Sequence, residues 1–301
     1  MRRLMLVAIV VLAVFVAALF AVLIGAPIAP GIDLGAYAKP ARGQTVVEAY
    51  QELEHLGGDL TVTRHYLTDW TDPRLGGFVA WSAENGNHPY ISLHTQTGST
   101  GITWAEVASG QQDDFLENFA DSIQGLGAPV WFSFHHEPEN DPDAGDSSDF
   151  RAAAQRVYEV MKPICSNCQI GVAFMRGTFG GAHGGIDSWL PDPQFMDFLG
   201  ADLYDKGGTT QLSTLAATSL AKARSLDKPL VIGESGTVEG RRTSNYKATW
   251  FRNARTFLKA NEDIMMYDYS HTTSQTYDYH VDTTPTALAA WREITADPYF
   301  A

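Results

Sequence analysis

Short apolar runs alternate with amphipathic stretches along the chain after residue 32. Runs typical of buried parallel strands fall at eight places: residues 34–37, 60–66, 90–94, 130–136, 170–174, 198–204, 230–233 and 264–269. Between them, apolar residues recur at helical spacing over residues 45–56, 112–126, 150–162, 212–225, 246–260 and 286–295. This alternation predicts a parallel sheet, and eight units favour a closed (β/α)8 TIM barrel over an open doubly wound sheet.

Two further features of the sequence concern residues 67–87 and the number of domains. Residues 67–87 show no clear helical pattern, so we expect them to be mostly loop. No repeat, low-complexity tract or second domain is evident. The sequence therefore predicts a single (β/α)8 domain over residues 33–301. Its length is close to the roughly 250 residues typical of this fold.

The first 32 residues form a separate segment. An uncharged apolar run at residues 4–24 follows Arg2 and Arg3 and, as a helix, would span roughly 30 Å of hydrocarbon. A removed signal usually has a shorter apolar region of about 7–15 residues, so we favour a retained membrane anchor over a cleaved signal. The short basic N-terminus places the barrel outside the cytoplasm, on the extracellular face of the membrane or secreted.

Charge and cysteine content exclude some functions. The net charge of −14 repels phosphate backbones, so we expect no nucleic-acid partner. The two cysteines, Cys165 and Cys168, cannot form a four-ligand zinc site alone. A redox pair would lack its usual sequence context, so in an oxidising compartment we expect a local disulfide with no catalytic role.

The candidate chemistry lies where the predicted strands end, because catalytic groups in such barrels come from the C-terminal ends of the strands. Glu137 and Glu234 follow the fourth and seventh apolar runs, and two carboxylates facing one cleft are the working parts of a glycosidase. The same ends supply a ring of polar and aromatic groups: Tyr37, Arg64, His65, Tyr66, His94, His135, His136, Arg176, Asp202, Tyr204, Asp268, Tyr269 and His271.

Other interpretations of these residues remain open. Glu139 is a rival acid, expected to be more solvated than Glu137. Histidines 94, 135 and 136 could suggest a metal, but no metal-ligand motif is present, and a metal would not explain Glu234. His135 is interpreted as a hydrogen-bonded core residue. Arg64 is expected to orient a carboxylate such as Glu234, or to form an ordinary ion pair at the barrel mouth.

Three short motifs resemble glycoside hydrolase family 26, within the retaining glycoside hydrolases of clan A. They are His136-Glu137, Gly35-Ala36-Tyr37 and Ile91-Ser92-Leu93-His94. The resemblance implies a TIM barrel with Glu137 as acid/base and Glu234 as nucleophile. It also implies that His136 contacts the sugar or positions the acid/base, and that Tyr204 hydrogen-bonds the nucleophile.

The chain also departs from that family. Many family 26 mannanases continue His-Glu with Met-Asn-Gly, whereas here Pro138 follows Glu137. The usual tryptophan of the eighth strand has no match, so Tyr269 or His271 would replace it. For the substrate-binding surface we expect Tyr37, His94 and Tyr269 to line the cleft, with a loop tryptophan such as Trp70 stacking on a sugar ring.

These observations predict a retaining β-glycoside hydrolase that acts on an extracellular polysaccharide or oligosaccharide without a cofactor. β-Mannan is the first expectation, with β-1,3-xylan and β-glucan as alternatives. A barrel that binds carbohydrate without turnover, or a metal-dependent polysaccharide hydrolase or deacetylase, would be the rival classes.

Overall fold

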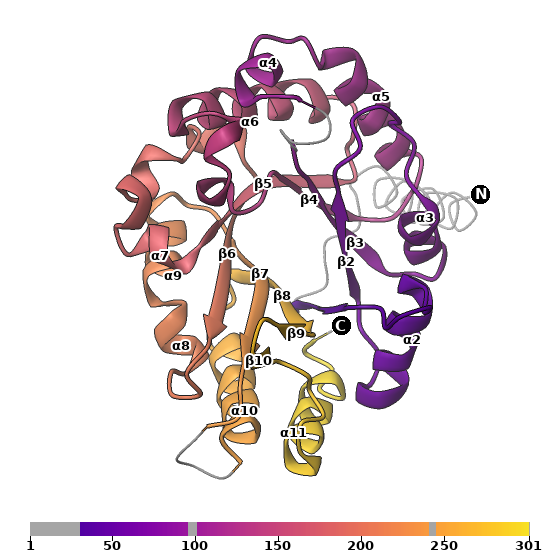
Figure 1. Ribbon diagram of the computed structural model, residues 1–301, viewed down its shortest axis with the longest axis vertical. Helices are drawn as coiled ribbons and strands as arrows, with labels where there is room; N and C mark the ends of the chain where they lie inside the picture. The colour runs from indigo at the N-terminus through magenta and orange to yellow at the C-terminus, as the bar shows by residue number, and fades with distance from the viewer. Residues whose placement is uncertain (1–30, 96–100, 241–244, 301) are drawn as a thin grey trace, which may run out of the picture. The chain divides into compact units, whose positions relative to one another are not determined.

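A computed structural model of the chain describes residues 31–95, 101–240 and 245–300. Eight parallel strands form a closed barrel in sequence order, and β1 pairs with both β2 and β8 (Figure 1). The predicted (β/α)8 architecture is confirmed. The strands are β1 (Asp33–Ala38), β2 (Val62–Leu67), β3 (His88–Leu93), β4 (Val130–Phe134), β5 (Cys168–Met175), β6 (Phe198–Asp205), β7 (Leu230–Thr237) and β8 (Ile264–His271).

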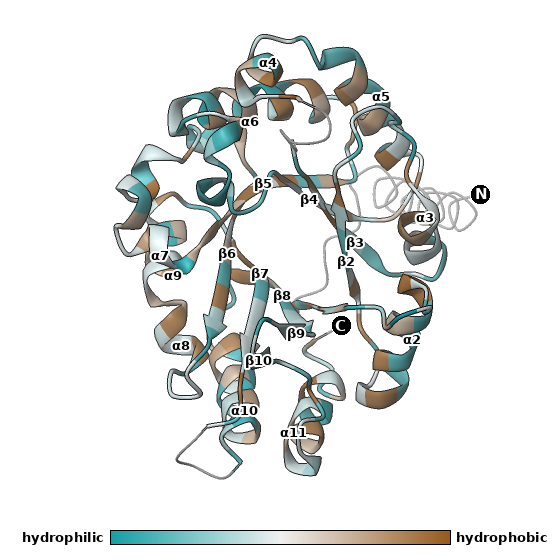
Figure 2. Ribbon diagram, in the orientation of Figure 1, coloured by the Kyte–Doolittle hydropathy of each residue, from teal (hydrophilic) through white to brown (hydrophobic). Residues whose placement is uncertain are grey.

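Helices surround the strands on the outside of the barrel (Figure 1). Hydrophobic and hydrophilic residues are interspersed along them, as Figure 2 shows. The apolar residues pack against the outward-facing strand residues in one large core cluster. The helices are α2 (Val46–Gly57), α3 (Gly77–Glu84), α4 (Trp104–Ala108), α5 (Asp113–Gln124), α6 (Ser147–Met161), α7 (Arg176–Phe179), α8 (Leu212–Leu215), α9 (Ala217–Ser225), α10 (Tyr246–Lys259) and α11 (Pro285–Thr295). A small hairpin, β9 (Thr273–Ser274) and β10 (Tyr277–Asp278), follows β8.

The barrel interior changes from apolar to polar along the strands. The part near the N-terminal ends of the strands is filled by a second buried cluster: Val62, Tyr90, Trp131, Phe198, Val231 and Met266. Because every second residue of a strand faces the same side, the interior positions that follow are polar or phenolic. On β2, Val62 is followed inside by Arg64 and Tyr66, and on β6, Phe198 is followed by Asp202 and Tyr204. This order brings polar groups to the C-terminal mouth.

Some elements differ from the sequence-based prediction, and α4, α7 and the β9–β10 hairpin were not predicted. Helix α3 (Gly77–Glu84) lies within the stretch predicted to be loop; it is short and has no side-chain cap at Gly76, so the sequence signals were weak. The predicted helix over 212–225 is two helices, α8 and α9. Strand β7 continues to Thr237, so Glu234 lies inside the strand rather than after it.

The cysteines and the apolar N-terminus have different outcomes. Cys165, in the turn after α6, and Cys168, the first residue of β5, form a disulfide, as the sequence predicted. The predicted hydrophobic helix over residues 4–24 lies outside the described residues. Within the described part of the chain, no helix has both the length and the apolar character needed to cross a bilayer.

Candidate active site

The two predicted catalytic glutamates meet at the C-terminal mouth of the barrel. Glu137 lies three residues beyond the end of β4, and Glu234 lies in β7. Together with Asp202 of β6 they place carboxylate oxygens within 4.8 Å of one another. The closed barrel therefore brings together three carboxyl groups that are far apart in the sequence, and they face one small volume.

A break in strand pairing turns Glu234 toward the barrel interior. The β6–β7 register passes from Ala201 opposite Ile232 to Asp202 opposite Glu234, which leaves Gly233 unpaired. Val231 faces the interior, so strict alternation would turn Glu234 outward; the extra residue reverses this. A Cβ on Gly233 would lie 2.8 Å from the Tyr90 hydroxyl, so the bend requires glycine.

Glu234 is held ionised by a set of donors. The hydroxyl of Tyr66 donates to its Oε1 at 2.7 Å, and that of Tyr204 donates to its Oε2 at 2.8 Å. His136 Nε2 lies 3.3 Å and Arg64 Nη2 3.7 Å from Oε1. Burial alone would raise the pKa of Glu234, but the hydrogen bond and charge of His136, the charge of Arg64 and the Tyr66 bond lower it to about 2. This is the state that a nucleophile needs.

Glu137 has the opposite environment. Its backbone adopts the left-handed conformation, with φ 52° and ψ 49°, directly after the strand. Its Oε2 accepts a hydrogen bond from the Asn140 amide at 2.9 Å. Burial and then the negative charge of Glu234 raise the pKa of Glu137 to about 8. A carboxyl group protonated at neutral pH can act as a general acid.

Asp202 is a third carboxyl group of this site. It is 3% exposed, and neither of its oxygens has a hydrogen-bond partner among the described residues. Burial and the charge of Glu234 raise its pKa well above the usual range. It lines, with Glu137, a pocket of about 480 Å³ that also contacts Arg176 and Lys206. This pocket extends the cleft on the Glu137 side.

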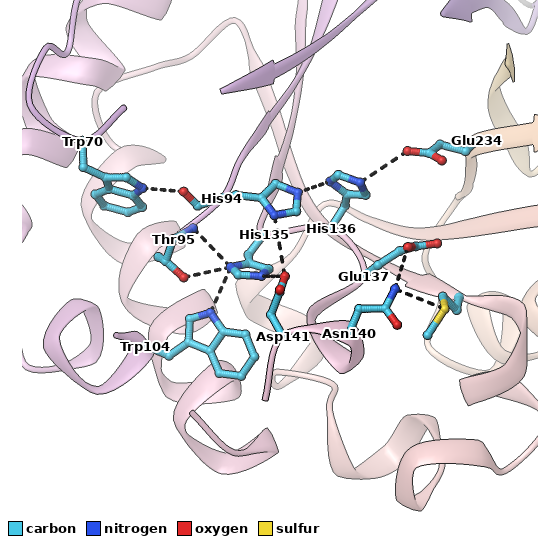
Figure 3. Close-up of polar contacts among 11 residues, drawn as sticks. Trp70, His94, Thr95, Trp104, His135, His136, Glu137, Asn140, Asp141 and Glu234 are labelled. Atoms are coloured by element: carbon cyan, nitrogen blue, oxygen red, sulfur yellow. Dashed lines mark hydrogen bonds and ion pairs between the residues drawn. The ribbon is translucent and has the colours of Figure 1, made fainter. Parts of the chain in front are cut away.

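Most other predicted site residues lie in the same cleft. Tyr37 packs edge-to-face on Tyr66 at 5.3 Å, and both line a pocket of about 380 Å³ with Glu234. The Arg64 guanidinium is stacked between the Tyr66 and Tyr90 rings and forms an ion pair with Glu234. His94 Nε2 pairs with His136 Nδ1, and His136 lies between His94 and Glu234 in Figure 3.

The structure does not bring Tyr269 or Trp70 to the cleft. Tyr269 is fully buried on the outer face of β8, against Phe251 and Trp291, because alternation along the strand turns it toward the helices. Trp70 is 5% exposed and stacks on Phe115, while its indole N–H donates to the carbonyl of His94 at 2.7 Å. Both residues support the site through packing.

Glu139, the rival acid, is engaged elsewhere. It is 7% exposed, and its Oε1 accepts hydrogen bonds from the backbone N–H of Met175 and the hydroxyl of Thr178. The expectation that Glu139 is more solvated than Glu137 was wrong. Its carboxylate joins the loop after β4 to the end of β5 and to α7.

The group His94, His135 and Asp141 has metal-like spacing, with ligand atoms within 4.8 Å of one another. However, Nδ1 of His135 accepts hydrogen bonds from the Trp104 indole N–H at 3.1 Å and the Thr95 backbone N–H at 3.2 Å. The ring proton therefore lies on Nε2, which donates to Asp141 Oδ2 at 2.8 Å (Figure 3). A histidine that binds a metal through Nε2 donates a hydrogen bond from Nδ1. In His135 the Nδ1 atom accepts hydrogen bonds, so it carries no proton to donate. These residues fit a hydrogen-bond network.

Sequence reasoning placed Tyr66 and Asp202 at the barrel mouth but gave them no role, and it missed Asn140. Tyr66 could have been found from its interior position two residues after Arg64. The Asn140 contact depends on the left-handed turn at Glu137, which no local sequence pattern signals.

Comparisons with known proteins bear on the fold. No family model matches the chain. A curated relative, Endoglucanase H of Acetivibrio thermocellus, is 22% identical over 294 residues, which cover 87% of this chain and 30% of the relative. The chain thus spans less than a third of that protein.

Solved structures with the same fold include two family 26 enzymes. A family 26 β-mannanase from Bacteroides ovatus matches with a TM-score of 0.62 and 13% identity, over 91% of this chain and 90% of the other. A modular endo-β-1,4-mannanase from Cellulomonas fimi gives 0.63 and 16%, over 90% and 72%. A fungal β-1,4-galactanase gives 0.57 and 14%, over 86% and 94%. The resemblance predicted from the motifs is confirmed at the level of architecture: the chain has the fold of the family 26 β-mannanases.

Proposed function

We propose that the protein is a retaining glycoside hydrolase that cleaves a β-linked polysaccharide. The observation that carries this proposal is the Glu137–Glu234 pair, whose carboxylate oxygens approach within 4.8 Å. Retaining enzymes hold their two carboxyl groups about 5–5.5 Å apart, whereas inverting enzymes need about 6.5–9.5 Å to fit a water. The opposite pKa shifts of the two groups match the two roles.

In the first step, Glu234 attacks the anomeric carbon while Glu137 protonates the leaving oxygen. The product is a covalent glycosyl-enzyme ester on Glu234. Formation of that ester removes the negative charge of Glu234, which is one cause of the raised pKa of Glu137. Glu137, now deprotonated and with a lower pKa, is suited to take a proton from the water that releases the sugar.

For the substrate we propose β-mannan first, with β-1,3-xylan and β-glucan as the alternatives. Support comes from structural relatives described as β-mannanases and from the motifs shared with family 26. Other relatives are described as a β-1,4-galactanase and an endoglucanase, so other β-linked polymers also belong among the substrates to be tested.

The test is a panel of defined polysaccharides with reducing-end detection: mannan, galactomannan, β-1,3-xylan, β-1,4-galactan and mixed-linkage β-glucan. We expect one polymer to be cleaved by the wild-type protein, and Glu234→Ala to abolish that cleavage. Added azide should restore turnover of an activated aryl glycoside by replacing the missing nucleophile. Binding without cleavage of any polymer, or full activity of Glu234→Ala, would contradict the proposal.

A further inference from the structure

One hydrogen bond closes the chain around Glu137. Strand β4 ends at Phe134. The backbone N–H groups of His135 and Glu137 still donate to the neighbouring strands, to Leu93 O of β3 at 3.0 Å and to Ala173 O of β5 at 2.9 Å. Six residues beyond His135, the Asp141 carboxylate accepts from His135 Nε2 at 2.8 Å. Residues 135–141 therefore form a loop with Glu137 inside it.

This loop contains two disfavoured backbone conformations. His135 has φ 45° and Glu137 has φ 52°, both in the left-handed region that residues with a Cβ avoid. Such conformations persist only where surrounding contacts over-determine them, and they cluster at functional sites. The loop after β4 must therefore be held by contacts on both sides of Glu137.

In the His135–Asp141 hydrogen bond, the His135 side chain is the rigidly held partner. It is completely buried, and two donors, Trp104 and Thr95, occupy its Nδ1. Its other nitrogen can only donate, and the acceptor it meets is Asp141, whose side chain is 48% exposed. A buried ring of fixed tautomer thus holds a carboxylate on a surface loop. The His135 hydrogen bond lowers the pKa of Asp141, so the acceptor is ionised at neutral pH.

The neighbour of Asp141 carries the contact to the catalytic group. Asn140 donates to Glu137 Oε2 at 2.9 Å and is the only side chain in the described residues that hydrogen-bonds to Glu137. Fixing Asp141 fixes the adjacent backbone, and with it the direction from which the Asn140 amide approaches.

We propose that the His135–Asp141 hydrogen bond is a clasp that positions Glu137 as the acid/base, acting through the loop backbone and Asn140. The proposal rests on the proposed function, because it assigns a purpose to the clasp only if Glu137 is the acid. His135 and Asp141 are positioning residues in this account; neither needs to touch the substrate.

A positioning role has a specific kinetic signature. General-acid catalysis matters for a sugar leaving group, which needs a proton, and hardly at all for 2,4-dinitrophenolate, which leaves unaided. Displacement of the acid by about 1 Å can cost about 100-fold in rate. Loss of the clasp should therefore lower kcat/KM about 10- to 100-fold for the polymer that the panel shows to be cleaved; galactomannan and its aryl glycoside are used below as the case of a β-mannanase. The kcat/KM for 2,4-dinitrophenyl β-mannobioside should change by less than about threefold.

Four variants separate the clasp from general damage. In His135→Asn, an amide oxygen can replace Nδ1 as acceptor for Trp104 and Thr95, but the side chain is too short to reach Asp141. Asp141→Ala removes the acceptor from the exposed side, so it tests the same bond without changing the core. Asp141→Asn keeps an oxygen acceptor and should stay within about threefold of wild type. Asp143→Ala, which removes an exposed charge two residues beyond the loop, is the matched control.

The outcomes distinguish this proposal from the proposed function. Glu137→Ala is measured with the same two substrates, and loss on galactomannan with retained kcat/KM on the aryl glycoside establishes the acid. If Glu137→Ala shows no such split, the acid assignment fails and the clasp proposal fails with it. If the split holds, but Asp141→Ala behaves like Asp143→Ala, or slows both substrates equally, the clasp alone is refuted.

Discussion

At the scale of single residues, the two glutamates have different neighbours, and this difference supports the two roles proposed for them. Glu234 receives hydrogen bonds from Tyr66 and Tyr204 and faces the positive charge of Arg64. Glu137 receives one amide hydrogen bond and faces the negative charge of Glu234. The same side chain is thereby an anion in one place and an acid in the other.

The first prediction concerns pH. Glu234 must be ionised and Glu137 protonated, so kcat/KM should be bell-shaped. It should fall with increasing pH through the pKa of Glu137, about 8, and with decreasing pH through that of Glu234, about 2. Over the range where the fold survives, we expect a plateau from about pH 4 to 7. A basic limb below about pH 6, measured with stable protein, would contradict the raised pKa of Glu137.

The second prediction concerns the phenols. Tyr66→Phe and Tyr204→Phe each remove one hydrogen bond from the Glu234 carboxylate, a bond to a charged group worth about 1.5–3 kcal/mol. We expect kcat to fall about tenfold or more in each variant and the acidic limb to move to higher pH. Tyr158→Phe removes a comparable bond to Asp197 on the outer surface and serves as the control. Equal activity of all three variants would refute this role.

At the scale of elements, the hydrophobic pattern was enough to predict eight strands, most helices and the position of the two glutamates at the barrel mouth. The elements can be predicted because burial of one face makes apolar residues recur every two residues in a strand and every 3.6 residues in a helix. The pattern could not predict the unpaired Gly233, which turns Glu234 inward, or the left-handed turn at Glu137. Tyr269 was misplaced because strand ends alone do not tell the interior face from the helix-facing one.

The third prediction concerns the turn between α6 and β5. Cys165 and Cys168 lie at the N-terminal end of β5, opposite the mouth that carries the glutamates. The double variant Cys165→Ser/Cys168→Ser should lose about 2 kcal/mol of unfolding free energy at most, because the closed loop is short. Activity should be unchanged. Mass spectrometry of alkylated wild-type protein checks the bond, and a folded but inactive double variant would count against a purely structural role.

At the scale of the whole molecule, the barrel gathers its catalytic groups because parallel strands all end at one face. Groups from β2 and β6 surround Glu234 of β7, although they lie far apart in the sequence. The net charge of −14 is compatible with a neutral polysaccharide and unsuited to a polyanion such as nucleic acid. The site, rather than the overall charge, is expected to set specificity.

The fourth prediction concerns the apolar run at residues 4–24. It remains a prediction that this segment anchors the chain with the barrel outside the cytoplasm. Membrane fractionation should recover the full-length chain in the membrane pellet, and protease added to intact cells should release the barrel. A mature N-terminus near residue 30, found by N-terminal sequencing, would show a cleaved signal instead.

The stereochemistry of cleavage tests the central claim most directly. The proposed double displacement rests on two carboxyl groups whose oxygens lie within 4.8 Å, closer than the about 6.5–9.5 Å at which an inverting enzyme accommodates its water. Proton NMR of the first-formed product, recorded before mutarotation, should show the β-anomer from a β-linked substrate. An initial α-anomer would mean inversion, and the assignment of Glu234 as nucleophile would have to be abandoned.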